Sequence, residues 1–227
     1  MKIAEIYLSI QGEGLLTGTE SAFVRTSGCN LRCWFCDTPF ASWSPEGDDL
    51  AVDDILARVE ELDCGHVVLT GGEPMLFAEL LPLAGELKRR GLHITVETAG
   101  TLYLPVEADL MSISPKLSNS APRGHHPRWR KRHERTRHAP AIVRRLLDEY
   151  AYQLKFVVQS PADCQEVERY LDQLPGVDRS LVLLMPQGTD SAELAARAAW
   201  LKPYCQQAGV RYCPRRQIEW FGLVRGT

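Results

Sequence analysis

The stretch from Ser21 to Thr38 has the sequence SAFVRTSGCNLRCWFCDT, in which a β-rich run leads into a loop with three cysteines. Ser21 to Ser27 is predicted to be a strand. Cys29, Cys33 and Cys36 follow it with the spacing Cys-x3-Cys-x2-Cys. We therefore expect three thiols to converge on one loop at the end of a strand.

Three thiolates within one short loop favour a metal centre. Structural zinc normally takes four ligands in a closed site, whereas an iron-sulfur cluster can accept three thiolates and leave one iron open. The alternative is a zinc site in which Cys64 or His66 provides the fourth ligand. An odd total of seven cysteines is not typical of a disulfide framework. The cysteines outside the loop have no motif around them and are expected to be small buried hydrophobic residues: Cys64, Cys164, Cys205 and Cys213.

The alternation of strands and helices continues on both sides of this stretch. Further strands are predicted at Lys2 to Leu8, His66 to Thr70, His93 to Thr98, Leu110 to Ser114, Gln153 to Gln159 and Ser180 to Met185. Helices are predicted at Val52 to Leu62, Glu79 to Arg90, Ala162 to Leu174 and Ala192 to Gln207, the last preceded by Asp190 as a cap.

This order of elements indicates an α/β fold in which helices cover a parallel sheet. About six or seven strand and helix units fit into the chain, at roughly thirty residues a unit. Because a complete TIM-type barrel needs about eight units, we predict a partial, incomplete barrel. We expect one domain over residues 1–227, with its chemistry at the C-terminal ends of the strands.

The composition is that of an ordinary globular protein, with 44% hydrophobic and 24% charged residues. No segment has the unbroken apolar run of a membrane span, and the N-terminal residues lack the apolar core of a signal peptide. We therefore expect a cytoplasmic protein with no membrane partner. The formal net charge of -3 is too small to indicate general attraction to nucleic acid.

Arg123 to Arg145 departs from this regular pattern. The segment holds nine of the 26 Lys and Arg residues and four of the six histidines, with Glu134 as its only acid. We interpret it as a basic insertion or loop, centred on residues 118–140 and exposed to solvent; binding of an anionic ligand or nucleic acid is the alternative. His125 and His126 lack an ordered ligand spacing, so no metal site is predicted there.

The cysteine spacing, with Phe35 before the last cysteine, resembles the signature of radical S-adenosylmethionine enzymes. Val67 to Pro74, VVLTGGEP, resembles the GGE motif of the same superfamily. The resemblance implies that the three thiolates hold a 4Fe-4S cluster whose open iron chelates S-adenosylmethionine, which one electron from the cluster then cleaves. It also implies that Gly72 and Glu73 line the methionine end of the cofactor, where Glu73 accepts hydrogen bonds from the ammonium.

Nearly the whole chain resembles the 7-carboxy-7-deazaguanine synthases of queuosine biosynthesis. The motifs that carry this resemblance are SIQGEG at Ser9 to Gly14, CNLRCWFCDT, TGGEP, VETAGT, SPKLSNS, LLMPQG and the terminal IEWFGLVRGT. Ala99 in VETAGT stands where the family more often has asparagine. The resemblance implies a lyase that contracts the ring of 6-carboxy-5,6,7,8-tetrahydropterin with loss of ammonia, forms 7-carboxy-7-deazaguanine and regenerates S-adenosylmethionine.

The same resemblance assigns roles to individual residues. Glu13 is predicted to accept two hydrogen bonds from the pterin edge, and Arg25 to bind the substrate carboxylate. Further implied substrate contacts are Ile10, Gln11, Gly12, Thr70 and the carboxylate of Thr227. The implied contacts to S-adenosylmethionine are Trp34, Phe35, Asp37, Gly72, Glu73, Glu97, Ser114, Pro115, Lys116, Met185, Pro186, Gln187 and Gly188. Thr38 is the implied Mg²⁺ ligand, unless Asp37 and Thr38 only cap the following turn.

The family also implies a flavodoxin- or ferredoxin-type electron donor and a homodimer. Two alternatives remain, a related enzyme and a protein of another functional class. A glycyl-radical-enzyme activase shares the cluster and cofactor but acts on a partner protein, and SIQGEG, Arg25 and the RGT ending argue against it. A metal-stabilised nucleic-acid-binding protein uses Arg123 to Arg145 for binding and the cysteine loop for structure.

Overall fold

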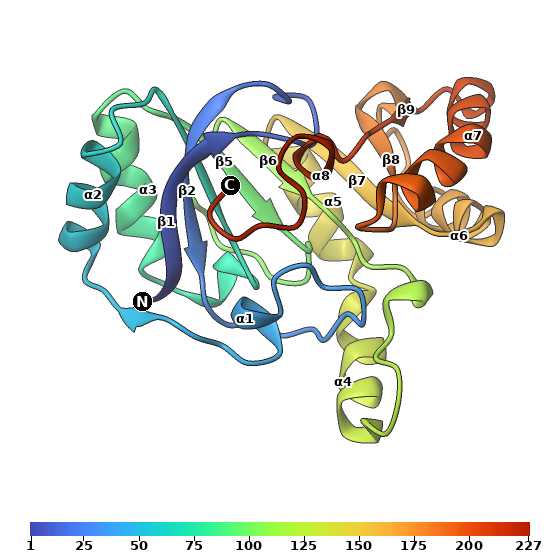
Figure 1. The fold of residues 1–227 in the computed structure, drawn as a ribbon, viewed down its shortest axis with the longest axis horizontal. Coiled ribbons are helices and arrows are strands. Elements are labelled where there is room, and N and C mark those ends of the chain that lie inside the picture. Colours follow the sequence, from blue (N-terminus) through green and yellow to red (C-terminus); the bar gives the residue numbers. More distant parts are fainter.

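The computed structural model describes all 227 residues, Met1–Thr227, and places one curved sheet at the centre of the molecule (Figure 1). The nine strands lie in the order β3-β1-β2-β4-β5-β6-β7-β8-β9. Their bounds are β1 (Lys2–Ile10), β2 (Glu20–Thr26), β3 (Asp48–Asp49), β4 (His66–Gly71), β5 (His93–Thr98), β6 (Leu110–Ile113), β7 (Tyr152–Val158), β8 (Val182–Pro186) and β9 (Arg211–Tyr212). Because β3 and β9 end the sheet without pairing with each other, the predicted partial barrel is confirmed.

All of the predicted strands are present, but the sheet is not parallel throughout. From β2 to β9 neighbouring strands run parallel, whereas β1 runs antiparallel to β2 and β3. The physical reason is the short connection from β1 to β2, in which Gln11 N–H donates to the Thr19 carbonyl at 2.9 Å. A link of this length closes a hairpin, while a parallel pair needs a crossover of a dozen or more residues.

Helices cover one face of the sheet (Figure 1). They are α2 (Val52–Glu60), α3 (Leu80–Arg89), α5 (Pro140–Glu149), α6 (Pro161–Leu171) and α7 (Ser191–Ala208). The predicted cap of α7 is confirmed, because Asp190 accepts from the N–H groups of Ala192 and Glu193 at 3.0 Å. Shorter elements are α1 (Pro39–Ser42), α8 (Arg216–Phe221) and the 3₁₀ turns η1 (Pro74–Leu76), η2 (Ser118–Ser120) and η3 (Arg179–Leu181). None of the helices has both the length and the apolar composition of a membrane span.

The two faces of the sheet differ in chemistry because alternate residues of a strand point in opposite directions. Under the helices lies one large apolar cluster that includes Val24, Leu69, Val96, Phe156 and Leu184. The neighbouring positions point to the opposite face, which we call the concave face. They include charged and polar residues in five adjoining strands: Arg25, Thr70, Glu97, Ser112, Gln153 and Lys155.

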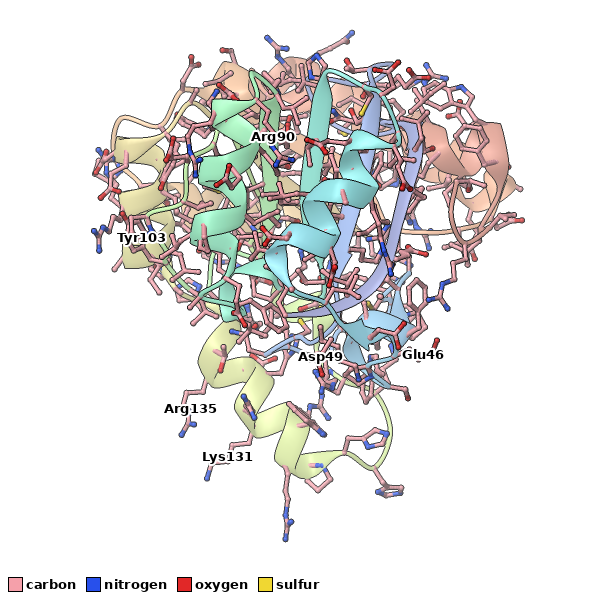
Figure 2. The ribbon with its side chains drawn as sticks, turned by 90° about the vertical axis from the view of Figure 1, so that its left-hand side faces the viewer. Glu46, Asp49, Arg90, Tyr103, Lys131 and Arg135 are labelled. Carbon is pink, nitrogen blue, oxygen red and sulfur yellow. The ribbon has the colours of Figure 1, made fainter.

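The basic segment is helical, contrary to the interpretation as a loop. It forms α4 (Pro127–Arg137) and most of α5. In Figures 1 and 2, α4 projects from the body of the molecule, and Lys131 and Arg135 point away from it. His133 is the only buried residue of α4. A helix with almost no apolar face has no hydrophobic periodicity, which is why the pattern did not reveal it.

The cysteine loop, Gly28–Thr38, packs its backbone directly on the turn after β4. Gly72 N–H donates to the Thr26 carbonyl at 3.1 Å, and Glu73 N–H donates to the Gly28 carbonyl at 2.8 Å. A Cβ atom at Gly72 would lie 2.1 Å from the Gly28 carbonyl oxygen. The double glycine was predicted to let the backbone approach a ligand, and here it admits the chain's own cysteine loop.

We expect Gly72→Ala to destabilise the protein by about 1–3 kcal/mol, since the added methyl overlaps the backbone carbonyls of Gly28 and Ala41. Gly65→Ala is the matched control, because a Cβ atom there meets nothing within 4 Å. Urea unfolding followed by circular dichroism measures both variants. Equal unfolding free energies for the two variants would contradict the close packing of the loop on the turn.

Candidate active site

The carboxyl ends of the parallel strands place four polar side chains on the concave face. Arg25 of β2 lies beside Thr70 of β4 in the pairing register. The Thr70 hydroxyl donates to Glu97 of β5 at 2.8 Å, and the Lys155 ammonium of β7 lies 3.9 Å from Glu97. Arg25, Thr70 and Glu97, to which the family resemblance assigns ligand contacts, therefore lie together at one edge of the sheet, and Lys155 joins them.

The carboxylate of Glu13 lies in the buried part of this face. It accepts from Lys155 Nζ at 2.5 Å, from Arg215 Nε at 3.3 Å and from the Gln217 amide. Burial by itself raises the pKa of a carboxyl, but attraction to Lys155 and Arg215 outweighs it and lowers the pKa of Glu13 to about 2. The same attraction raises the pKa of Lys155. Glu13 is thus an anion at neutral pH.

Arg215 connects three segments that are far apart in the sequence. Besides Glu13, its guanidinium donates to Asp37 of the cysteine loop and to the Gly188 carbonyl after β8 at 2.5 Å. The turn after β8, at which Met185 to Gly188 were predicted to contact the cofactor, is thereby placed against the cysteine loop. Sequence reasoning missed Lys155, Arg215 and Gln217. Lys155 gave a signal, since it is a lone charge in the apolar strand QLKFVV.

Arg25 is enclosed by groups from β1. Its Nε donates to Glu5 at 2.6 Å and its Nη2 to the Tyr7 hydroxyl at 2.7 Å. The second Glu5 oxygen accepts from Arg225 of the C-terminal tail at 3.1 Å. Burial raises the pKa of Tyr7, while the Arg25 charge opposes this. Glu5, Tyr7 and Arg225 were also missed by the sequence analysis, because only the β1–β2 register and the path of the tail bring them to Arg25.

Other predicted substrate residues lie around this pocket in different ways. Gln11 is buried, and its amide donates to Ser21 at 2.9 Å. Ile10 is partly exposed at the end of β1, and Gly12 packs against Gln217. Thr227 is exposed, and its hydroxyl donates to the Val224 carbonyl at 2.9 Å. In Figure 1 the tail crosses the open side of the sheet in front of β1 and β2, although no contact joins Thr227 to Arg25 or Glu13.

The three thiols of the cysteine loop share one small apolar cluster with Leu31, Phe35 and Ala99. Burial raises the pKa of Cys29 to about 11 and that of Cys33 to about 12. All three are free thiols. At neutral pH the thiols of Cys29 and Cys33 carry protons, which a bound metal centre must displace.

The chemistry of the loop fits an iron-sulfur cluster better than a zinc ion. The loop offers three thiols, whereas a structural zinc ion requires a fourth protein ligand. In a 4Fe-4S cluster each thiolate binds a separate iron, so its ligands enclose a wider space than zinc needs. The alternative fourth zinc ligands, Cys64 and His66, lie at the opposite end of β4 from the turn that carries the cysteine loop. Buried oxygens of Ser27 and Asn30 have no hydrogen-bond partner in the protein and can accept from a bound group.

Glu73 occupies a different environment from the expected one. Its side chain is fully buried and accepts from Thr98 Oγ1 at 2.8 Å, Ala99 N–H at 2.9 Å and Met75 N–H at 3.2 Å. Burial raises its pKa, and these hydrogen bonds oppose the shift. The carboxylate therefore ties the end of β4 to the end of β5, whereas we expected it to be open to the cofactor's ammonium.

Residues after β6 complete the surroundings of the loop. Lys116 Nζ donates to the Ser114 carbonyl and hydroxyl at 2.7 and 2.8 Å, and its charge acts on Cys33. Trp34 donates to the Asn119 carbonyl at 2.7 Å. His133 of α4 accepts from the Arg32 N–H at 3.1 Å, and burial lowers its pKa to about 4. The cysteine loop is thus held from three sides by β4, β6 and α4.

Thr38 precedes α1 without making a capping hydrogen bond. Its hydroxyl lies 3.7 Å from Cys36 Sγ, while Asp37 is paired with Arg215. The alternative in which Asp37 and Thr38 only cap the turn is not supported, since neither side chain does so.

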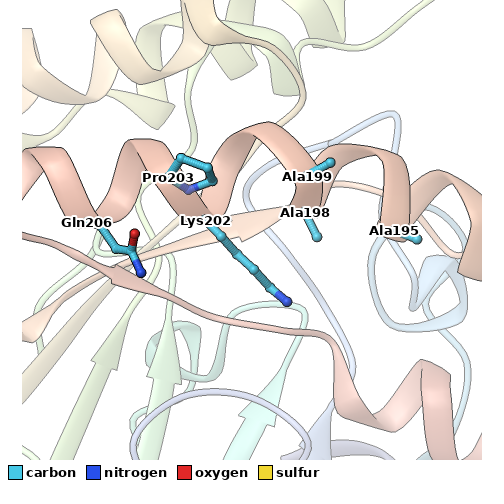
Figure 3. Close-up of a pocket in the computed structure, with 6 residues that line it drawn as sticks. All are labelled: Ala195, Ala198, Ala199, Lys202, Pro203 and Gln206. Atoms are coloured by element: carbon cyan, nitrogen blue, oxygen red, sulfur yellow. The ribbon is translucent and has the colours of Figure 1, made fainter.

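A surface hollow of about 510 Å³ lies away from this chemistry (Figure 3). Its lining comes entirely from α7: Ala195, Ala198, Ala199, Lys202, Pro203 and Gln206. Lys202 is its only titratable group, and no residue of the concave face reaches it. We therefore assign it no part in the site.

Known proteins share this architecture and these motifs. The model of the Radical SAM superfamily matches residues 23–157. A 7-carboxy-7-deazaguanine synthase from Rhodopirellula baltica is 47% identical over 99% of this chain and 88% of its own length. One from Halobacterium salinarum is 44% identical over 96% of this chain and 89% of its length.

Solved structures agree with the fold. The crystal structure of QueE from Escherichia coli matches with a TM-score of 0.69 at 23% identity, covering 95% of this chain and 93% of that one. Taken with the cysteine loop at the carboxyl edge of an open barrel, these matches establish that the chain belongs to the radical SAM superfamily and, within it, to the 7-carboxy-7-deazaguanine synthase family.

Proposed function

We propose that the protein converts 6-carboxy-5,6,7,8-tetrahydropterin to 7-carboxy-7-deazaguanine by radical ring contraction with loss of ammonia. One observation carries this proposal in the molecule itself. An ionised Glu13 and an Arg25, both only partly exposed, lie on the same concave face, at the edge where the cysteine loop is held. A pterin acid offers donors on its amino-pyrimidinone edge and a carboxylate at the other end, which suit these two charges.

Recognition of the pterin edge falls to Glu13 and Gln217. The Gln217 Oε1 atom is buried without a hydrogen-bond partner, and its amide already donates to Glu13. A substrate that brings N–H donors satisfies this oxygen and the remaining lone pairs of Glu13. Lys155 and Arg215 keep Glu13 ionised, so it acts only as an acceptor. Ile10, Gln11 and Gly12 shape the same loop.

Recognition of the substrate carboxylate falls to Arg25. Two of its donors are engaged by Glu5 and Tyr7, and the rest of the guanidinium is available to a second carboxylate. Glu5 also pairs with Arg225, so it can keep a cationic partner when Arg25 turns to the substrate. Thr70, oriented by Glu97, adds a hydroxyl at this end. The carboxylate of Thr227 is a further candidate contact from the tail.

Cys29, Cys33 and Cys36 would hold the 4Fe-4S cluster. When bound, the cluster and S-adenosylmethionine supply the radical that removes one hydrogen atom from the substrate. Trp34, Phe35, Gly72 and the Ser114 to Lys116 and Met185 to Gly188 segments surround the loop and would orient the cofactor. The position of the cofactor would also depend on three carboxylates that fix the cysteine loop and the strand ends around it: Asp37, Glu73 and Glu97. The Thr38 hydroxyl would contribute a hard oxygen ligand to Mg²⁺.

The proposal includes a supply of single electrons from a flavodoxin- or ferredoxin-type protein, a homodimer and a place in the cytoplasm. The deazapurine product enters queuosine or a related pathway. These assignments follow from the family, and none depends on a contact described above.

The test of the function is anaerobic turnover by the reconstituted protein with S-adenosylmethionine, Mg²⁺, dithionite and 6-carboxytetrahydropterin. We expect 7-carboxy-7-deazaguanine, detected by mass spectrometry. Cys29→Ala should abolish both cluster and product, whereas Cys64→Ala, outside the loop, should retain both. Deoxyadenosine without deazaguanine would mean that the substrate is another one, such as a partner's glycine.

Glu13→Gln is expected to lower kcat/KM for the pterin about 10- to 100-fold, because a hydrogen bond to a charged group contributes about 1.5–3 kcal/mol. Glu20→Gln, on an exposed residue of the same hairpin, should leave kcat/KM unchanged. If both variants retain wild-type kcat/KM, Glu13 does not bind the substrate.

The pH dependence of stability tests the charge of Glu13 separately. Its pKa is lowered from 4.5 to about 2, so ionisation contributes about 3 kcal/mol to stability. This contribution is complete above about pH 4.5 and is lost as the pH falls toward 2. The unfolding free energy of Glu13→Gln should therefore lie below that of the wild type at pH 7, with a gap that narrows below pH 4.5. A gap independent of pH would contradict the buried anion.

A further inference from the structure

We propose that α4 and the residues before it form the docking surface for an acidic one-electron carrier protein. The basic helix surface, as we call it, comprises Arg123, Arg128, Arg130, Lys131, Arg132 and Arg135. The proposal rests on the radical chemistry proposed above and on the need of the cluster for single electrons. It does not depend on which substrate the concave face binds.

The charge of this surface is not neutralised by carboxylates of the molecule. All six residues are exposed, and none forms an ion pair within the chain. The acid of α4, Glu134, pairs with Arg137, which also pairs with Glu166 at 3.2 Å. The chain as a whole has a formal net charge of -3, so the cations are concentrated here against the overall sign. Figure 2 shows Lys131 and Arg135 pointing into solvent on a helix that stands clear of the sheet.

The surface is joined directly to the cysteine loop. His133, on the buried side of α4, accepts from the Arg32 N–H at 3.1 Å and pairs with the Ser120 hydroxyl at 2.9 Å. The Arg32 guanidinium stacks 3.9 Å from the Trp129 ring of α4. Arg32 lies between Cys29 and Cys33, so the base of the helix packs on the loop that holds the cluster.

A second set of contacts joins the segment before α4 to the same loop. The Arg123 guanidinium lies 3.2 Å from the Trp34 ring, which follows Cys33. The His126 ring lies 5.3 Å from that of Trp43, and Trp43 donates to the Cys33 carbonyl at 2.9 Å. A protein bound to the basic helix surface therefore lies next to the cysteine loop. This position keeps the distance for electron transfer to the cluster short.

The observations favour an electron carrier over nucleic acid. Trp34 and Trp129 are covered by Arg123 and Arg32, so they do not offer the open aromatic faces on which bases stack. A carrier with acidic groups around its redox centre is complementary to the unpaired cations and is steered to them at low ionic strength. In the transfer the reduced carrier loses one electron and the cluster gains it, passing from the 2+ to the 1+ state; no bond is made or broken.

The test compares two triple variants of the cluster-loaded protein. The first variant reverses the charge of the basic helix surface with Arg128→Glu, Lys131→Glu and Arg135→Glu. Arg58→Glu, Arg169→Glu and Arg211→Glu make the same change in net charge at exposed positions on α2, α6 and β9. The probe is an acidic bacterial flavodoxin. Its binding in the oxidised form is measured by calorimetry, and reduction of the cluster by its reduced form is measured by stopped-flow absorption.

At low salt we expect the α4 variant to bind flavodoxin with an affinity at least about tenfold lower than that of the wild type. We expect the rate at which reduced flavodoxin reduces its cluster to fall by a similar factor. The control variant should resemble the wild type, and dithionite, a small reductant that needs no docking, should reduce all three proteins equally. Wild-type binding and reduction of the α4 variant would overturn the proposal. The proposal would also be overturned if the α4 variant lost binding to transfer RNA or single-stranded DNA but kept its binding to flavodoxin. The surface would then bind nucleic acid. Failure of pterin turnover alone would not affect these readouts.

Discussion

The direct backbone contact between the ends of β2 and β4 is the constraint on which the rest of the site depends. A parallel sheet brings the carboxyl ends of its strands to one edge, but side chains normally keep the loops beyond them apart. Gly72 removes that separation, so that the Gly28 and Thr26 carbonyls accept from the turn after β4. The cysteine loop is thereby fixed over the concave face. Glu73 joins the same turn to the end of β5, because its carboxylate accepts hydrogen bonds from Thr98 and Ala99. The close backbone contact at Gly72 therefore fixes both the place where the cluster would be held and the turn after β4.

Buried charge provides the second level of organisation. Glu13, Lys155, Arg215 and Asp37 come from the first hairpin, the middle of the sheet, the C-terminal segment and the cysteine loop. Breaking such a network by removing one partner is costly, because the remaining charge is left in the protein without a counter-charge. The network fixes the positions of the segments that carry these charges, because burying a charge without its partners costs free energy. The ends of the chain are thus held at the pocket, and the anionic pole of the pocket stays ionised.

The sequence predicted the elements with strong periodicity and the motifs with unusual chemistry. All strands that alternate or form apolar runs were found, as were the open barrel, the cysteine loop and the cap of α7. The two-residue strands β3 and β9 are too short to produce a pattern, and α4 has only His133 buried, so it has no apolar period to detect. The partners of Glu13 and Arg25 lie up to about two hundred residues away, and only the assembled sheet identifies them. The partners of Glu73 within the chain were not predicted, because a motif gives the identity of a residue but not the direction of its side chain.

The central claim is that the concave face presents C6 of the pterin to the cofactor held at the cysteine loop. The most direct test is turnover with substrate that carries deuterium at C6, followed by mass spectrometry of the recovered S-adenosylmethionine. If the hydrogen at C6 is abstracted and the cofactor is regenerated, the recovered S-adenosylmethionine should contain deuterium. S-adenosylmethionine recovered from the same reaction with Cys33→Ala protein should contain none. Deuterium found only in water, with unlabelled S-adenosylmethionine and continued product formation, would contradict the account.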